Sequence, residues 1–391
     1  MKIIALAAAL AIIGGPVSAG QSSIKIGILN DQNGPFADLG GPGTVLAARM
    51  AVQDFGNSVL GRPIEVVTAD TQNKPDNAAS IAARWIDVQA VDVIAGVPVT
   101  SVALAVKNVT ERKGRILLAT EPASTEITSD CPKYTVHWMD NTDALASGTV
   151  AAVVKDGGKK WFFLTADFAF GATMESAARK KIAELGAQVV GEVRYPVGTF
   201  DFASFLLVAA NSPADVVGVT SVGADTANAV RQAAEFGLSS YGKKVIVFLT
   251  FLTEINAIGL DHAQGAYVTT GLYWDENDAT RSWSKRYFAK MSKMPTQAQM
   301  NTYAAIMHYL NSVKQVGSDD PLKVMGAMRA SPADYFGKRA SVRKDGRVLY
   351  DLQLFRIKAP RESKYPWDYL RPVRTINANE AFGDGPPGCR E

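Results

Sequence analysis

Short apolar runs alternate with stretches of helical periodicity from residue 24 onward. The runs include IKIGIL from residue 24, VDVIAG from residue 91 and RILLAT from residue 115. Between them, stretches such as TVLAARMAVQDF and SVALAVKNVTERKG repeat apolar residues at helical spacing. Strands that alternate with helices of this length predict a parallel sheet whose two faces are both covered by helices.

The same alternation restarts after the segment YTVHWMD at residues 134–140. It continues through KKWFFLTA, QVVGEVRY, ADVVGVT and KKVIVFLT, with helical stretches between these runs. The restart predicts an α/β protein with two doubly wound, Rossmann-like lobes, each with its own parallel sheet. Residues 279–330 then read as consecutive helices, and RVLYDLQLFRIK at residues 347–358 alternates like an antiparallel edge strand or a hairpin arm.

The N-terminal segment MKIIALAAALAIIGGPVSAGQ has the pattern of a secretory signal. One cation, Lys2, precedes an apolar run over residues 3–13, and Val17 and Ala19 fit a small-residue cleavage site. We therefore expect a signal peptide at residues 1–19, cleaved near Ala19, and export to the periplasm. The alternative is that this run forms a first buried strand or helix.

The amino-acid composition limits the kinds of molecule that the protein could bind. The chain has 391 residues, of which 47% are hydrophobic and 20% charged, which is enough for two domains with sizeable cores. Its 41 basic and 38 acidic residues give a formal charge of only +3, without a long Lys/Arg block. This balance argues against binding to nucleic acid.

The chain has two cysteines, Cys131 and Cys389. In an oxidising compartment a single structural disulfide is the default interpretation, and two free buried thiols are the alternative, because sequence alone does not establish proximity. Their spacing matches no zinc motif, and no His, Cys or carboxylate cluster has the spacing of metal ligands. We expect no metal.

Glycine-rich turns occur, but no catalytic motif accompanies them. The first loop contains Gly41 and Gly43, yet Leu46 stands where the third glycine of a dinucleotide fingerprint belongs. A phosphate-binding P-loop is absent, and Ser221 misses the nucleophile-elbow spacing by one position. The sequence therefore predicts a protein that holds a ligand without a cofactor and without transforming it.

Several longer segments together resemble a known family. They are NGPFADLGGPG, DFAFG, SVGADTANAVRQAAEFGL, QGAYVTTGLYWDEND and ESKYPWDYL followed by a Cys near the end of the chain. In order and spacing they are similar to the periplasmic substrate-binding proteins of ABC importers, in the branch that includes the leucine/isoleucine/valine-binding proteins. The resemblance implies two lobes joined by three crossings that close on a ligand like a flytrap. It places residues 24–139 and 272–334 in the first lobe and residues 140–271 and 335–391 in the second.

The resemblance also implies ligand-contacting turns in the first lobe. Thr100 and Ser101 follow the third strand and correspond to the family's site for the ligand carboxylate. The backbone N–H groups and the dipole of a helix N-terminus favour an anion there, although Ser101 could equally be a plain helix cap. Ala123 and Ser124 follow the fourth strand, and Phe36 lies in the first loop, as a pocket wall or a loop anchor.

In the second lobe, Phe170 stands where the family often places an aromatic residue. Its side chain could form a wall of the ligand pocket or serve as an ordinary packing anchor. Two turns depart from the branched-chain members, which have aromatic and acidic residues there. One contains Val222 and Gly223, and the other, LTFLT at residues 249–253, contains Thr250 and Phe251.

The resulting hypothesis is a monomeric solute-binding protein that is not an enzyme. It captures a small carboxylate-bearing solute, aromatic or amino-acid-like, and delivers it to an ABC permease. Carboxylates with an apolar body are favoured over free amino acids, because the second lobe lacks an acidic partner for an ammonium group. Glu121 or Asp31 could supply that partner instead. An α/β enzyme and an amide- or amino-acid-responsive sensor with the same fold are the competing hypotheses.

Overall fold

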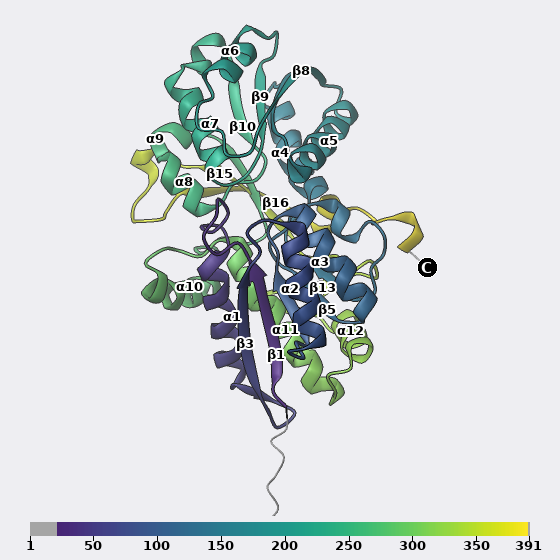
Figure 1. Cartoon of the computed structure of the whole chain (residues 1–391). Helices are drawn as coiled ribbons and strands as arrows, with labels where there is room; N and C mark the ends of the chain where they lie inside the picture. The colour runs from purple at the N-terminus through teal and green to yellow at the C-terminus, as the bar shows by residue number, and fades with distance from the viewer. Residues whose placement is uncertain (1–21, 390–391) are drawn as a thin grey trace, which may run out of the picture.

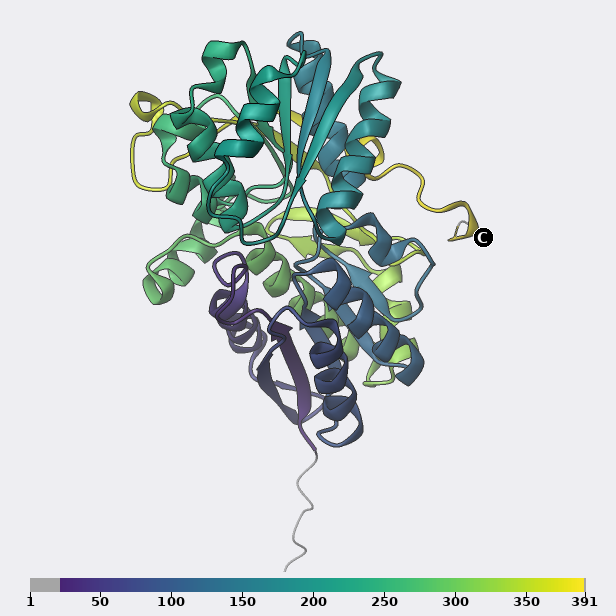
Figure 2. The ribbon, with the colours of Figure 1, turned by 45° about the horizontal axis from the view of Figure 1, so that its top comes forward.

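The computed structural model describes residues 22–389, so the proposed signal peptide lies outside the described residues. Two lobes lie one above the other in Figure 1, each built around a sheet with helices on both faces. Figure 2 shows the same division after a rotation about the horizontal axis. The predicted fold class, two doubly wound α/β lobes, is confirmed.

The first lobe contains a six-stranded sheet in the order β2-β3-β1-β4-β5-β6, parallel except for β2. Because β4 and β5 are covered on both faces, all of their residues are buried. Its elements in chain order are β1 (Ile24–Asn30), α1 (Gly41–Phe55), β2 (Ser58–Val59), β3 (Arg62–Asp70), α2 (Pro75–Asp87), β4 (Val93–Gly96), α3 (Thr100–Lys113), β5 (Ile116–Ala119), η1 (Thr125–Thr128) and β6 (Thr135–His137). In Figure 1 the arrowheads of β1 and β3 point toward the other lobe.

The second lobe contains a four-stranded parallel sheet in the order β10-β9-β7-β8. Strand β9 is buried throughout, which explains why its sequence VVGVT is an uninterrupted apolar run. The elements are α4 (Thr142–Lys155), β7 (Lys160–Ala166), α5 (Ala169–Glu184), β8 (Gln188–Tyr195), α6 (Ala203–Asn211), β9 (Val216–Thr220), α7 (Ala224–Glu235), η2 (Leu238–Tyr241), β10 (Lys244–Val247), α8 (Leu252–Ile258), α9 (Leu260–Ala263) and β11 (Tyr267–Thr270).

The C-terminal part of the chain begins with three helices and continues with short strands. The consecutive helices expected over residues 279–330 are α10 (Asp278–Met291), α11 (Gln297–Val316) and α12 (Pro321–Ala330), and α11 packs along α1. They are followed by β12 (Ala333–Tyr335), β13 (Lys338–Val342), β14 (Val348–Leu349), β15 (Leu352–Ile357), η3 (Pro360–Glu362), β16 (Leu370–Ile376), α13 (Ala378–Phe382) and η4 (Pro387–Cys389).

Two small antiparallel sheets organise this tail. One has the order β12-β13-β14, and the other has the order β11-β15-β16. Strand β15 is antiparallel, as the alternation of residues 347–358 predicts, but it is the central strand and not an edge strand, because β11 pairs with its second side. The boundary predicted between residues 334 and 335 falls inside β12, and the assignment of the tail to the two lobes stays a prediction.

Three short segments between elements, at residues 138–141, 271–277 and 350–351, stand where the expected crossings between the lobes would lie. The carboxylate of Asp140, in the first segment, is fully buried and bonds to both of the others. Its Oδ2 accepts from the N–H of Gly271 at 3.1 Å, and its Oδ1 accepts from the hydroxyl of Tyr350 at 2.8 Å. Gln297 Nε2 donates a further bond of 2.9 Å to Oδ1. One carboxylate therefore ties the three segments together.

Cys131 and Cys389 form a disulfide, with Cα atoms 5.5 Å apart. The bond joins the loop after η1 to the last described turn, 258 residues away in sequence. It fastens the C-terminal tail to the first lobe, and the default interpretation of the two cysteines is confirmed.

Candidate functional site

A small cavity lies between the lobes, where the carboxyl ends of the first lobe's strands face the second lobe. Its walls are predominantly apolar, and its volume of about 20 Å³ is room for about one water molecule. A larger solute therefore requires the lobes to separate. The lining residues are Phe36, Leu39, Pro98, Val99, Glu121 and Ala123 of the first lobe, and Phe168, Phe170, Val222, Leu249 and Phe251 of the second.

Aromatic rings close this cavity from both sides. Phe36 of the first lobe stacks on Phe168 of the second, with ring centroids 6.4 Å apart and 18° between the ring planes. Phe168 in turn meets Phe170 at 5.8 Å. The loop that carries Phe36 is held by Asp31, whose Oδ1 accepts from Gly34 N at 2.7 Å and whose Oδ2 accepts from Phe36 N at 2.9 Å. Asp31 thus organises the loop and is not available for a ligand ammonium group.

The turn between β4 and α3 presents a helix N-terminus beside the cavity. Val97, a β-branched residue, has a φ of 63°, a left-handed conformation that is costly for such a side chain. It directs Pro98 and Val99 into the cavity wall. Helix α3 then begins at Thr100 without a side-chain cap, so its first N–H groups are open to an external acceptor.

The hydroxyl of Thr100 is the second polar feature of this turn. Thr100 is 1% exposed, and its Oγ1 has no hydrogen-bond partner within residues 22–389. A buried, unpaired hydroxyl beside an uncapped helix N-terminus suits a carboxylate, which would accept from both.

Glu121 is the one ionisable residue in the cavity wall. It follows β5, and Gly40 leaves room for its carboxyl group, since a Cβ at that glycine would lie 2.7 Å from Oε1. Oε1 accepts from Thr44 Oγ1 at 2.6 Å and from Asn30 Nδ2 at 3.3 Å. Burial raises the pKa of Glu121 from 4.5 to about 7, against the opposing effect of these two hydrogen bonds.

Glu254 is a second buried carboxyl group, in the second lobe. Its Oε1 accepts from Gly223 N, and its Oε2 accepts from Thr250 Oγ1 at 2.9 Å and from Phe251 N at 3.1 Å. Burial raises the pKa of Glu254 to about 7 as well. Because both oxygens already have partners, Glu254 holds the turns that carry Val222 and Phe251 in place.

The structure divides the ten sequence-predicted ligand residues into two groups. Five line the interlobe cavity: Phe36, Ala123, Phe170, Val222 and Phe251. The other five lie around it: Thr100 and Ser101 begin α3, Ser124 caps η1 by accepting from Glu126 N, and Gly223 and Thr250 donate to Glu254. Their roles in binding stay predictions.

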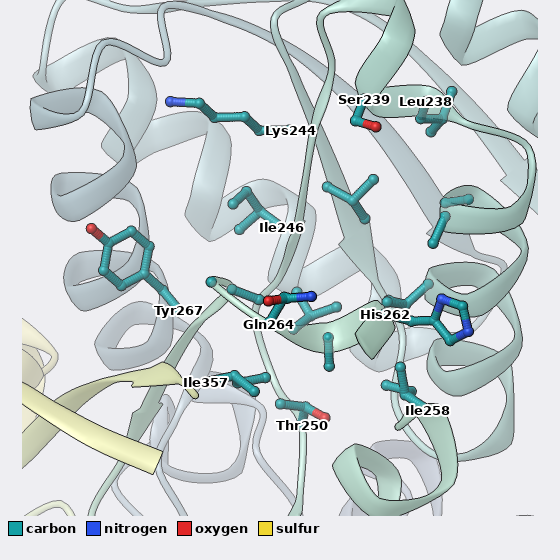
Figure 3. A pocket seen from close by; sticks show the side chains of 18 of the residues that line it. Leu238, Ser239, Lys244, Ile246, Thr250, Ile258, His262, Gln264, Tyr267 and Ile357 are labelled. Carbon is teal, nitrogen blue, oxygen red and sulfur yellow. The ribbon is translucent and has the colours of Figure 1, made fainter. Parts of the chain in front are cut away.

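A larger cavity, of about 480 Å³, lies within the second lobe and is drawn in Figure 3. Ile246 of the edge strand β10 and Ile258 form part of its apolar wall, and Tyr267 and Lys244 stand toward one side. Thr250 lines this space and not the interlobe cavity. We regard the smaller cavity as the functional site, because both lobes line it and because it lies at the carboxyl ends of parallel strands.

Comparison with known proteins agrees with this geometry. A family model described as periplasmic binding protein matches residues 23–364. The chain belongs to the periplasmic binding protein family. Members are substrate-binding proteins, as are the structural neighbours of this chain. Within residues 22–389 we find no cluster of side chains suited to a metal ion and no helix long and apolar enough to cross a membrane.

Two solved structures similar to this periplasmic binding protein share its fold over more than nine tenths of the chain. A crystal structure of a periplasmic binding protein from Burkholderia mallei is 42% identical, with a TM-score of 0.92 over 95% of this chain and 99% of that chain. A branched-chain amino acid ABC transporter periplasmic ligand-binding protein from Burkholderia xenovorans is 37% identical, with a TM-score of 0.83 over 92% of this chain and 97% of that chain. The Leu/Ile/Val-binding protein homolog 6 of Brucella melitensis is 26% identical over 274 residues, 69% of either chain.

Several lining residues of this periplasmic binding protein were not among the sequence-predicted ones. Phe168 lies two residues before Phe170 in the same turn, so the aromatic pair DFAF was the available signal. Glu121 and Asp31 were both named as alternative partners for a ligand ammonium group, and Glu121 is the one of the two that lines the cavity. Leu249 begins the turn LTFLT that departs from the branched-chain members. Leu39, Pro98 and Val99 carried no signal beyond their place in loops after strands.

Proposed function

We propose that this protein captures a small carboxylate-bearing solute with an apolar or aromatic body and delivers it to an ABC permease. The proposal includes export to the periplasm after removal of residues 1–19. The observation that carries it is the conjunction of an uncapped α3 N-terminus and a buried, unpaired Thr100 hydroxyl with phenylalanine-rich walls. The first two suit a carboxylate, and the walls suit an apolar body.

Lobe closure is the proposed mechanism. Each lobe supplies part of the wall, so only the closed form makes all of the contacts, and the ligand stabilises that form by its differential affinity for it. The Burkholderia xenovorans relative is named a branched-chain amino acid ABC transporter periplasmic ligand-binding protein. This name supports a role of the present protein in an ABC transport system, and it makes branched-chain amino acids solutes that should be tested.

A thermal-shift screen tests the proposal. The panel contains benzoate, 4-hydroxybenzoate, phenylacetate, 4-methyl-2-oxopentanoate, leucine and phenylalanine, with benzamide as the uncharged analogue of benzoate. A true ligand at about a thousand times its dissociation constant adds about 4 kcal/mol to the free energy of unfolding. Calorimetric titration then ranks the responders.

We expect at least one carboxylate to bind, and benzoate to bind more tightly than benzamide if the aromatic acids respond. Tighter binding of the amide than of its acid would contradict the carboxylate assignment. A screen in which no carboxylate responds would overturn the proposal.

A further inference from the structure

The hydrogen bonds of Glu121 are unevenly divided between its two oxygens. Thr44 Oγ1 and Asn30 Nδ2 both donate to Oε1. Oε2 is buried, and no donor or acceptor within residues 22–389 contacts it. A carboxyl group surrounded in this way carries its proton on Oε2, because Oε1 already accepts two bonds. Glu121 lines a cavity whose other walls are apolar.

We propose that Glu121 binds the ligand as a neutral carboxylic acid, donating from Oε2 to an anionic oxygen of the ligand, so that capture is linked to one proton. This inference rests on the proposed function, since it requires a carboxylate in the interlobe cavity. A bond of the type O–H···O⁻ is charge-assisted and strong, and a buried orphan oxygen gains a partner by it.

The surroundings of Glu121 favour the neutral form. The negative charge of Asp31, in the loop after β1, disfavours a second charge on Glu121 and raises the pKa of Glu121. His137 contacts the neighbouring Pro122 carbonyl at 2.6 Å, and burial lowers the pKa of this histidine well below its usual value, so it is uncharged. The second-lobe walls, Phe168, Phe170, Val222, Leu249 and Phe251, contain no titratable side chain.

This arrangement determines whether ligand binding takes up or releases a proton. The unliganded protein ionises Glu121 near pH 7. A ligand carboxylate beside Oε2 would repel the ionised form, which raises the pKa further in the complex. Binding therefore takes up a proton above about pH 7, and affinity falls by up to about tenfold per pH unit there. A ligand that offered an ammonium group to Oε2 would give the opposite slope.

The first measurement uses the unaltered protein. The carboxylate that binds most tightly in the thermal-shift screen is titrated by calorimetry between about pH 5.5 and about pH 8.5, at each pH in two buffers of different ionisation enthalpy. We expect a constant dissociation constant below about pH 6.5, a rise above about pH 7, and an uptake that approaches one proton per ligand. A constant affinity with no proton exchange, or proton release, would overturn the proposal.

The second measurement uses Glu121→Gln and the control Glu65→Gln. Glutamine keeps an oxygen for Thr44 and Asn30 and places an NH₂ donor at the position of Oε2, so it imitates the neutral acid. We expect Glu121→Gln to bind the same carboxylate within about threefold of the wild type at pH 6 and to lose the pH dependence. Glu65 is exposed on β3, and Glu65→Gln should keep the wild-type profile.

Failure of this inference is distinguishable from failure of the proposed function. If no carboxylate binds at any pH, the proposed function fails, and the inference falls with it. If a carboxylate binds but Glu121→Gln keeps the wild-type pH profile, only the role of Glu121 is wrong. Loss of binding in Glu121→Gln, with proton release in the wild type, would assign Oε2 to a cationic group of the ligand.

Discussion

Phe36 stacks on Phe168 across the boundary between the lobes, with their ring centroids 6.4 Å apart. This contact joins the loop after β1 to the turn after β7 and closes one side of the interlobe cavity. Because the two rings belong to different lobes, the proposed opening of the lobes would separate them.

Removal of these rings should therefore affect binding. We expect Phe168→Ala and Phe170→Ala each to weaken binding of the tightest carboxylate by about 1–3 kcal/mol. Phe168 is only partly buried, so its replacement should change the melting temperature of the unliganded protein little, whereas Phe170 is buried in the core and its replacement should also lower that temperature. Calorimetry and thermal unfolding measure the two effects. Phe200→Ala, at a side chain that is 84% exposed in the second lobe, is the control. Unchanged affinity in both variants would make these rings packing anchors only.

The hydroxyl of Thr100 can be tested without a cost to the fold. Since its Oγ1 has no partner in the described part of the chain, Thr100→Val should leave the free energy of unfolding unchanged or slightly raised. Affinity for the carboxylate should fall by about 1.5–3 kcal/mol, the usual range for a hydrogen bond to a charged group. Thr253→Val, which removes another unpaired hydroxyl outside the interlobe cavity, should not alter affinity.

Asp140 should be important for the connection between the lobes. In Asp140→Asn, an NH₂ group replaces one acceptor oxygen, so at least one of the donors from Gly271, Gln297 and Tyr350 loses its partner. We expect a loss of about 1–3 kcal/mol per unpaired donor in urea unfolding. Asp201→Asn, on the exposed surface of the second lobe, provides the comparison, and equal stability of the two variants would contradict this role.

The disulfide should stabilise the chain mainly through the unfolded state. It closes a loop of 258 residues, and typical disulfides contribute about 2–4 kcal/mol. We expect the double variant Cys131→Ser/Cys389→Ser to lose a free energy of unfolding in this range. Reduction of the wild type should reproduce the loss. Two thiols that react with an alkylating agent in the native, unreduced protein would show that the bond does not form.

Stability of the unliganded protein should depend on the pH through Glu121. Its pKa in the folded protein, about 7, lies above its ordinary value of 4.5, so its stabilising effect is complete below about pH 4.5 and is lost as the pH rises through 7. A pKa shift of this size changes the free energy of unfolding by at most about 3 kcal/mol. Relative to the wild type, Glu121→Gln should gain stability between about pH 5 and about pH 8, measured by urea unfolding, whereas Glu65→Gln should not.

The local pattern of apolar and polar residues was sufficient to predict the alternation of strands and helices. The run IKIGIL became β1, VVGVT became the fully buried β9, and the glycine-rich first loop led into α1. These features depend on side-chain periodicity over a few residues, which the sequence displays directly. The aromatic Phe170 was named from its place after a strand and from the family resemblance, and it lies in the first turn of α5.

The polar side of the cavity depended on contacts between distant segments. Glu121 and Asp31 both follow strands, and nothing local distinguishes them. The loop amides of Gly34 and Phe36 donate to Asp31, whereas the side chains of Asn30 and Thr44 donate to one oxygen of Glu121, and the other oxygen has no partner within residues 22–389.

The sequence by itself therefore determined which segments form strands and helices, and hence the two-lobed α/β architecture. Only the tertiary structure decided which loop residues meet between the lobes, such as Phe36 with Phe168, and which segments share the carboxylate of Asp140. The physical reason is that periodicity is a property of neighbouring residues. The direction of a loop side chain is instead set by hydrogen bonds and packing in three dimensions, with partners such as Thr44 and Asn30 that are 77 and 91 residues from Glu121, or Gly271 and Tyr350 that are 131 and 210 residues from Asp140.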